Sequence, residues 1–218
     1  MENKNKNNKA STVKKEEHAV VLDYLSRGYV KSDMSKFGGK AIAQAIGTEQ
    51  FTLLELAPKT GVDLEIQDTV YIGKGKRDKI YRVLGKLDYE NLTATSRIEL
   101  EYAIRDIVES QEDKYVEFFN TAEALSTRLH KLELIPGIGK KYMWEIIEAR
   151  EEKPFESFED FSQRLPTLAD PAGMIVKRVQ QELDTSTPKR GKNKYNLFTQ
   201  PPRGQRKPQR KPRNYVIN

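Results

Sequence analysis

The most constraining feature of this 218-residue chain is a short turn sequence, Leu134-Ile135-Pro136-Gly137-Ile138-Gly139-Lys140-Lys141. Pro136 cannot continue a preceding helix, because its ring removes the backbone N–H and clashes with the turn before it. Gly137 and Gly139 allow backbone angles that other residues resist, and Ile138 between them serves as an apolar plug. The segment therefore predicts a tight turn between two helices.

The residues on either side of the turn predict the flanking helices. Residues 127–133 favour a short helix with Ser126 as its N-cap, and a second helix starts at Lys140 with Ile146 and Ile147 on its inner face. Free backbone N–H groups at the start of that helix, beside Lys140 and Lys141, suit a phosphate oxygen. The alternative is a turn that only joins two helices or contacts protein.

A second helical pair follows the turn. Ser157 is placed to cap a helix that has Asp160 at its third position, a variant of the capping box. The core of this part is supplied by Phe155, Phe158 and Phe161. The next turn, 165–169, lacks the glycine pair and is interpreted as structural. Asp170 caps the following helix, with Pro171 at its first position.

The front half of the chain has the pattern of short strands. β-Branched and apolar runs between turn residues predict a small closed or half-closed barrel within 18–92, and we interpret it as OB-like. The runs are 18–25, 41–46, 51–56, 70–72 and 79–84. The last two flank a candidate hairpin loop whose cations are Lys74, Lys76, Arg77 and Lys79. This loop is either a solvated charged turn or a nucleic-acid contact, as in OB barrels.

Linking helices are expected over 93–119, where apolar residues recur near helical spacing. Those residues are Ile98, Tyr102, Ile104 and Val108. The carboxylates within 99–113 could hold magnesium in a nuclease, but their spacing scatters them around the helix and favours a solvated face. For Trp144 we expect packing between the two domains rather than base stacking. For His130 we expect a hydrogen-bonded structural role.

The net charge of +6 conceals a strong asymmetry. Residues 185–218 carry +10 with no Asp or Glu, residues 1–17 carry +2, and the rest carries −6. Both terminal segments lack a pattern that could bury apolar area, so 1–17 and 185–218 are expected to be disordered. The C-terminal mixture of arginine and aromatic residues suits single-stranded RNA, and a solubilising tail is the alternative. Its candidate contacts are Arg203, Arg206, Lys207, Arg210, Lys211 and Arg213.

Several other classes of site and location are not expected. The chain has no cysteine and two histidines, so we predict no disulfide framework, no metal cluster and no cofactor. No run approaches the roughly 20 apolar residues that span a bilayer, and the N-terminus lacks the apolar stretch of a signal peptide. We therefore predict a cytoplasmic protein without a membrane partner.

The turn and its second helix resemble the helix-hairpin-helix family, whose core is an apolar residue, Pro-Gly-Ile-Gly and a helix ending in Ile-Ile. The stretch Lys153-Pro154-Phe155-Glu156-Ser157-Phe158-Glu159-Asp160-Phe161 resembles the one that follows the hairpin in tandem helix-hairpin-helix domains, and the likeness spans 120–184. Over 18–184 the chain is similar to the archaeal domain of unknown function 655 family, through its β-rich front half, Phe118-Phe119-Asn120 and the run 128–144. This likeness implies a barrel, a tandem helix-hairpin-helix domain and, from the family's label, nucleotide or RNA contact.

The expected fold is α+β: an OB-like barrel, an all-α tandem helix-hairpin-helix domain and a disordered basic tail. The expected function is non-catalytic binding of nucleic acid, RNA in preference to DNA, with the ribosome or its RNA as a candidate partner. A DNA-binding accessory protein of repair or replication and a protein-interaction adaptor are the alternatives. An enzyme ranks lowest, because the wider motif of helix-hairpin-helix glycosylases is absent. The oligomeric state stays open.

Overall fold

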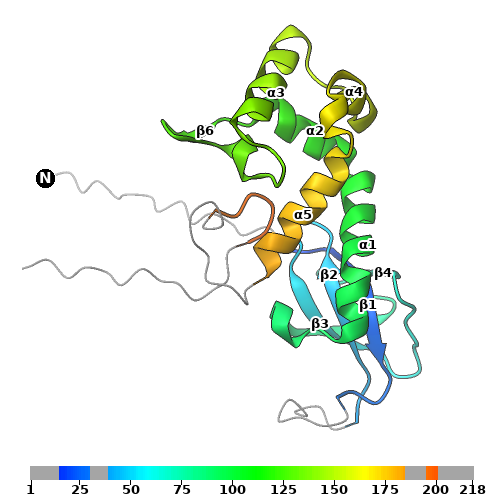
Figure 1. The fold of residues 1–218 in the computed structure, drawn as a ribbon. Helices are drawn as coiled ribbons and strands as arrows, with labels where there is room; N and C mark the ends of the chain where they lie inside the picture. Colours follow the sequence, from blue (N-terminus) through cyan, green and yellow to red (C-terminus); the bar gives the residue numbers. More distant parts are fainter. Residues whose placement is uncertain (1–14, 30–38, 185–194, 201–218) are drawn as a thin grey trace, which may run out of the picture.

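The structure, a computed structural model, describes residues 15–29, 39–184 and 195–200. Within them the chain is α+β, with a curled five-stranded sheet at one end and a group of helices at the other (Figure 1). The strands are β1 His18–Leu25, β2 Ile42–Gly47, β3 Leu53–Pro58, β4 Thr69–Tyr71 and β5 Ile80–Lys86. All five coincide closely with the predicted runs, because each run alternates or concentrates residues that suit a half-buried strand.

The sheet has the strand order β4-β1-β2-β3-β5, and every ladder is antiparallel. In the described residues no ladder joins β4 to β5, so the sheet is a half-barrel that stays open along this side. The loop 73–78 therefore connects the two edge strands and is not a hairpin loop, which corrects that expectation. The reason is that β4 pairs with β1 and β5 pairs with β3 instead of with each other.

The two faces of the sheet bury different side chains, as the alternation along a strand requires. One face packs Ala19, Val21 and Leu56 into a small core inside the curl. The other face packs Val20 and Leu22 against the helices, in a larger core that continues through the helical part. The helices and this second face of the sheet thus share one continuous apolar core, separate from the small core inside the curl.

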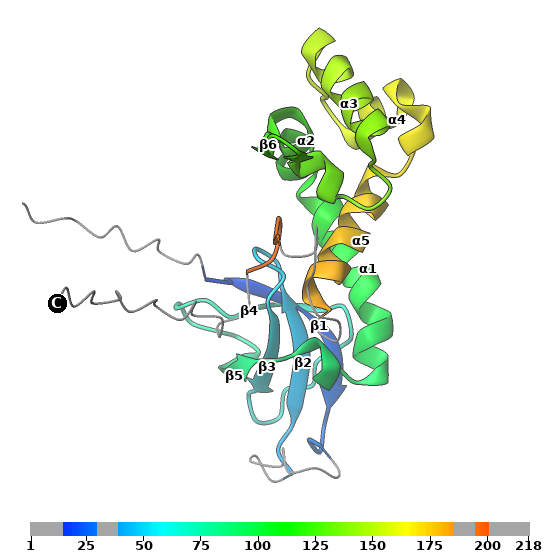
Figure 2. The ribbon, with the colours of Figure 1, turned by 60° about the vertical axis from the view of Figure 1, so that its left-hand side comes forward.

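Helix α1 (Ala94–Ser110) covers the sheet and runs beside α5 (Pro171–Leu183), as both views show (Figures 1 and 2). Of the four residues whose spacing predicted an amphipathic helix, Ile104 and Val108 are buried, whereas Ile98 and Tyr102 are 64% and 62% exposed. The buried row is Leu100, Ala103, Ile104, Ile107 and Val108. This helix carries two apolar rows, and the row with more apolar side chains faces the core.

The remaining helical part is built from short elements. In chain order they are η1 Tyr89–Asn91, α2 Glu112–Thr121, β6 Ala124–Ser126, β7 Leu129–His130, η2 Lys131–Leu134, α3 Lys140–Glu152, α4 Phe158–Arg164 and η3 Pro166–Leu168, where η marks a 3₁₀ helix. The predicted caps of α4 and α5 are confirmed. The Ser157 hydroxyl accepts from the Asp160 N–H at 3.0 Å, and the Asp170 carboxylate accepts from the Gly173 N–H at 2.8 Å. Local capping chemistry therefore sets where α4 and α5 begin.

The expectation that 185–218 is disordered throughout is wrong for residues 195–200, which we call the clasp. Its Thr199 is buried, and its backbone is hydrogen-bonded to α5. The expectation of disorder over 1–17 is likewise wrong for residues 15–17, because the Glu16 carboxylate accepts from the Gln50 and Thr52 N–H groups. The expectations for 1–14, 185–194 and 201–218 lie outside the described residues. None of the helices in the described part is long and apolar enough to cross a membrane.

Asp170→Ala is expected to lower the free energy of unfolding by about 1 kcal/mol at pH 7, the usual cost of losing an N-cap. A hydrogen bond from Arg105 and the bond from the Gly173 N–H hold the pKa of Asp170 below its usual range. The carboxylate therefore stabilises the fold above its ordinary pKa of about 3.9, and this contribution disappears as the pH falls through the lowered value. Thermal unfolding of both proteins at pH 7 and pH 3 checks this. A stability difference that widens toward acid would contradict it.

Candidate nucleic-acid interface

The predicted turn forms between η2 and α3. Gly137 takes a φ of +90°, which favours glycine, and the Ile138 N–H closes the turn by donating to the Ile135 carbonyl at 3.1 Å. Ile138 is buried, as its role as a plug required, and so is Ile146 on α3. The turn and the inner face of its second helix are therefore as predicted, with Ile147 packed at the edge of the core.

The helix before the turn differs from the prediction. Residues 127–133 were expected to be helical from Ser126, but β6 and β7 form a two-stranded ribbon there, and the 3₁₀ helix η2 begins only at Lys131. His130 caps the start of η2, because its Nδ1 accepts from the Leu132 N–H at 3.1 Å. The Glu133 carboxylate in turn accepts from the His130 N–H at 2.9 Å, which completes a capping box.

His130 thus has the structural role that was expected of it. Burial, and then the positive charge of Arg150, lower the pKa of His130. Nδ1 can accept the Leu132 N–H only in the neutral ring that carries its proton on Nε2, and the lowered pKa favours the neutral ring.

The N-terminus of α3, like that of α2, has no side-chain cap. Side chains cap α1, α4 and α5, through Thr93, Ser157 and Asp170, whereas the N-cap of α3 is Gly139, which has no side chain to offer. The first backbone bond into this helix runs from the Met143 N–H to the Gly139 carbonyl. The N–H groups of residues 140–142 precede it and have no intrahelical partner.

Nothing in the described part of the chain requires a glycine at position 139, so the expectation of backbone angles that other residues resist holds for Gly137 and not for Gly139. Its φ of −89° is open to any residue, and a Cβ built there would meet no atom within 4 Å. Gly139 and Gly137 line an open hollow together with residues 133–136, Ile138 and Gln181. The missing side chain therefore leaves the start of α3 open to an outside acceptor.

Two lysines begin α3 directly after this opening, and a tryptophan follows one helical turn later. Lys140 and Lys141 are exposed, and Lys141 Nζ lies 3.7 Å from Glu145 Oε1. Trp144 is 58% exposed, so the prediction that it packs between domains is wrong. The inner face of α3 is taken by Met143 and Ile146, and Trp144 lies on the outer face one turn after Lys140.

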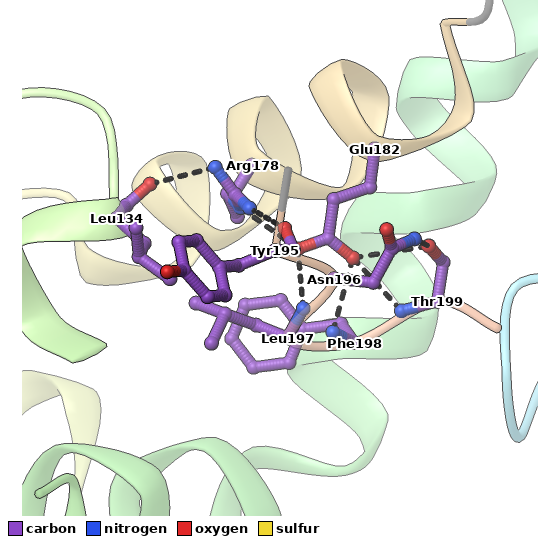
Figure 3. Close-up of polar contacts among 8 residues, drawn as sticks. All are labelled: Leu134, Arg178, Glu182, Tyr195, Asn196, Leu197, Phe198 and Thr199. Atoms are coloured by element: carbon purple, nitrogen blue, oxygen red, sulfur yellow. Dashed lines mark hydrogen bonds and ion pairs between the residues drawn. The ribbon is translucent and has the colours of Figure 1, made fainter. Parts of the chain in front are cut away.

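A buried ion pair holds the clasp and reaches the turn (Figure 3). Arg178 and Glu182, one helical turn apart on α5, are joined at 2.7 Å, and their side chains are almost wholly buried. Arg178 also donates to the Leu134 carbonyl at 3.0 Å and to the Tyr195 carbonyl. Glu182 accepts the clasp N–H groups of Leu197 (2.6 Å), Phe198 (3.1 Å) and Thr199 (2.9 Å).

The aromatic ring of Phe198 completes the attachment. It packs edge-to-face on Tyr115 and Phe118 of α2, with ring centroids 5.5 and 5.1 Å apart. Burial raises the pKa of Tyr115. Sequence reasoning missed the clasp, although residues 195–199 are an uncharged, partly apolar run within a basic segment. That contrast was the available signal.

The basic loop 73–79 lies at the edge of the sheet, apart from the turn. Lys79 Nζ binds Asp68 at 2.6 Å and holds the pKa of that carboxyl below its usual range. Arg77 Nε donates to the Gly73 carbonyl at 2.9 Å, so both side chains have partners within the fold. Lys74 and Lys76 are exposed. The hollow that Lys74 and Arg77 line shares no residue with the hollow at the turn, so the structure does not bring the two candidate regions together.

The other residues that the sequence suggested for a site do not form one in the described part of the chain. The carboxylates within 99–113 include Glu109, which pairs with Arg105 at 3.3 Å, and Glu112, which accepts from the Phe158 N–H. Across residues 15–29, 39–184 and 195–200 there is no group of three or more side chains placed to hold a metal ion. The tail cations from Arg203 to Arg213 lie outside the described residues.

The chain is similar to archaeal proteins whose function is uncharacterized. The protein MJ0038 of Methanocaldococcus jannaschii is 48% identical over 184 residues, which cover 84% of this chain and 79% of that protein. The crystal structure of Af1531 from Archaeoglobus fulgidus, assigned to DUF655, matches with a TM-score of 0.76 and 42% identity over 85% of this chain and 100% of that one. The profile of the family described as "Protein of unknown function (DUF655)" matches residues 15–200, a span that includes the turn and the clasp. This chain therefore belongs to the DUF655 family.

Proposed function

We propose that this chain is a non-catalytic nucleic-acid-binding protein that grips backbone phosphates with the turn at Pro136–Lys141, acting as a helix-hairpin-helix module. The observation that carries the proposal is the open N-terminus of α3, where a glycine that the fold does not require leaves N–H groups uncapped. Backbone N–H groups, the helix dipole and the two adjacent lysines all favour a phosphate oxygen there.

The second turn has the opposite chemistry, which supports a division of labour in a tandem helix-hairpin-helix domain. At η3 and the start of α5, the carboxylate of Asp170 already occupies the helix N-terminus and also pairs with Arg105 at 3.1 Å. An anion would meet a negative charge there. The second repeat is therefore structural, and the first repeat binds.

The sheet and the tail complete the proposal. We interpret the open half-barrel as an OB-like unit. The six cations of 203–213 would add affinity through counterion release. The preference for RNA, and for ribosomal RNA or the ribosome as target, rests on the arginine- and proline-rich tail and the family resemblance. Exposed Trp144 supports a contact beyond phosphate, since an exposed indole can stack on a base.

The target class is tested by titrating the full chain with RNA and DNA of matched sequence and several lengths, single-stranded and duplex, at several salt concentrations. RNA is expected to bind more tightly. A clear preference for duplex DNA would overturn the choice of RNA and favour an accessory role on DNA. Crosslinking in cells followed by sequencing would then identify the bound molecules. An absence of enrichment over an unrelated basic protein would count against any specific target.

Gly139→Asp separates binding from folding. An aspartate at the N-cap would accept the free N–H groups of α3 itself, as Asp170 does on α5, and would stabilise the fold by a few tenths of a kcal/mol. The same carboxylate would repel phosphate and occupy its donors. Hydrogen bonds to charged groups contribute about 1.5–3 kcal/mol, so affinity is expected to fall at least about tenfold while the thermal midpoint is kept.

Gly139→Ala is the matched control, because it fills the same open space without an acceptor or a charge. Its affinity should lie between those of the wild type and Gly139→Asp. Equal affinity of the wild-type and Gly139→Asp proteins would remove the turn from the binding surface.

A further inference from the structure

A hollow of about 790 Å³ opens at one end of the curled sheet, away from the turn. It lies where β1 and β3 end, where β2 begins and along β5. The lining residues that matter here are Tyr24, Lys40, Lys59, Tyr81, Arg82 and Leu84. None of the described residues that line it lines the hollow at the turn, so the two surfaces are separate.

Two β-bulges on the edge strand β5 direct residues into this hollow. In the pairing with β3, Leu56 faces Val83 while Glu55 faces Gly85, so Leu84 is left without a partner. The pairing likewise steps from Arg82 to Ile80, and Tyr81 is left over. A bulge re-aims the side chain of the extra residue and is common beside binding sites. Both extra residues line the same hollow.

Tyr81 offers a flat ring to solvent. Its side chain is not part of either apolar core, and the residue is 70% exposed, more than any other large hydrophobic residue in the described part of the chain. Packing therefore does not explain an aromatic residue at this bulge. A stacking partner from outside does, because every nucleobase has a face that an aromatic ring can cover.

The charges around Tyr81 favour a polyanion. Lys40 and Lys59 line the hollow together with Arg82, and among its described lining residues Asp63 supplies the one carboxylate. Asp63 is engaged within the fold, since the hydroxyl of Tyr24 donates to its carboxylate at 3.0 Å. An unstacked nucleotide can bind such a surface twice, because a cation attracts its phosphate and an exposed aromatic ring stacks on its base.

The geometry points to this hollow as a second binding surface, which takes a single-stranded segment of RNA with one base on Tyr81 and neighbouring phosphates beside Lys40 and Lys59. The inference rests on the proposed function and adds that the bound RNA is single-stranded at this surface. Bases in a duplex are stacked on each other, so a duplex cannot use Tyr81 in this way.

The test compares Tyr81→Ala with Tyr102→Ala in the full chain. Tyr102 is the matched control, because it is a similarly exposed tyrosine on α1 that does not line the hollow. The probes are an oligouridylate of about 12 nucleotides, within the site size of such surfaces, and an RNA duplex of equal length. Tyr81→Ala should weaken single-strand binding about tenfold, the loss of one base stack. It should leave duplex binding unchanged, and Tyr81→Phe should bind the single strand like the wild type.

The outcomes separate this inference from the proposed function. If the wild type binds both probes and Tyr81→Ala binds the single strand as tightly as Tyr102→Ala, the inference is wrong and the phosphate-binding turn stands. If the wild type binds neither probe, both fail. If Tyr81→Ala does not fold, Lys40→Gln plus Lys59→Gln replaces it. That variant should reduce the salt slope for the single strand by about 1.4, and an unchanged slope overturns the inference.

Discussion

Glu182→Ala is expected to lower the free energy of unfolding by about 3–5 kcal/mol, the usual cost of breaking a buried ion pair from one side. Removing the carboxylate leaves the guanidinium of Arg178 buried without its counter-charge and strips the clasp of the acceptor for three backbone N–H groups. For a chain of this size the change corresponds to a fall in thermal midpoint of roughly 6–20 °C. Thermal and denaturant unfolding both measure it.

Glu109→Ala is the control for this variant. Glu109 forms the same i,i+4 pair with Arg105, at 3.3 Å, but its side chain is 53% exposed. Water and salt screen such a pair, so its loss should change stability by less than about 1 kcal/mol. Similar losses in the two variants would mean that burial does not set the strength of the Arg178–Glu182 pair.

The double variant Arg178→Met plus Glu182→Leu tests what the pair adds beyond charge balance. Apolar replacement of a whole buried pair is often neutral or stabilising. Here we expect only partial recovery, because Leu134, Tyr195 and the clasp backbone also depend on these two side chains. Full recovery of the wild-type midpoint would show that the clasp bonds contribute little.

The pair also has a consequence for binding, because Arg178 Nη1 donates to the carbonyl of Leu134, directly before the turn. The clasp, α5 and the residue before the turn form one hydrogen-bonded chain. The proposed basic extension beyond Gln200 is therefore attached to the same support that positions the turn. We propose that the turn contacts the nucleic-acid backbone and that the basic residues after Gln200 add affinity.

What the sequence predicted well is local. The strand positions follow from runs of a few residues, and the caps at Ser157 and Asp170 follow from a side chain and an N–H three residues away. The plug at Ile138 follows from the turn itself. In each case the decisive interaction spans only a few residues, so the sequence alone contains it.

The features that the sequence predicted poorly depend on contacts between residues far apart in the chain. The sheet and α5 determine which side of α1 is buried, and Ile98 lies on the side that stays exposed. Trp144 is exposed because α3 meets the core through Met143 and Ile146. The clasp forms because Glu182 on α5 accepts the N–H groups of residues 197–199, which lie 15 to 17 positions further along the chain. None of these choices is visible in a short window of sequence.

Lys140→Glu plus Lys141→Glu is expected to weaken binding of the full chain to single-stranded RNA by about 10- to 100-fold, because two cations beside the proposed phosphate site become anions. The slope of the logarithm of the binding constant against the logarithm of the salt concentration should fall in magnitude by about 1.4 for a single strand and about 1.8 for a duplex. These values correspond to the loss of two phosphate contacts. Titrations at several salt concentrations measure both quantities.

The fold should tolerate this double reversal. Lys140 and Lys141 are exposed residues in the first turn of α3, where glutamate interacts favourably with the positive end of the helix dipole. An unchanged thermal midpoint would thus assign the loss to binding. Lys74→Glu plus Lys76→Glu makes the same change of net charge on the loop at the sheet edge, and should cost less if the turn sets the position of the backbone. If the turn variant instead keeps the wild-type affinity and salt slope, the turn contacts protein, and the chain is an adaptor whose affinity for nucleic acid comes from elsewhere.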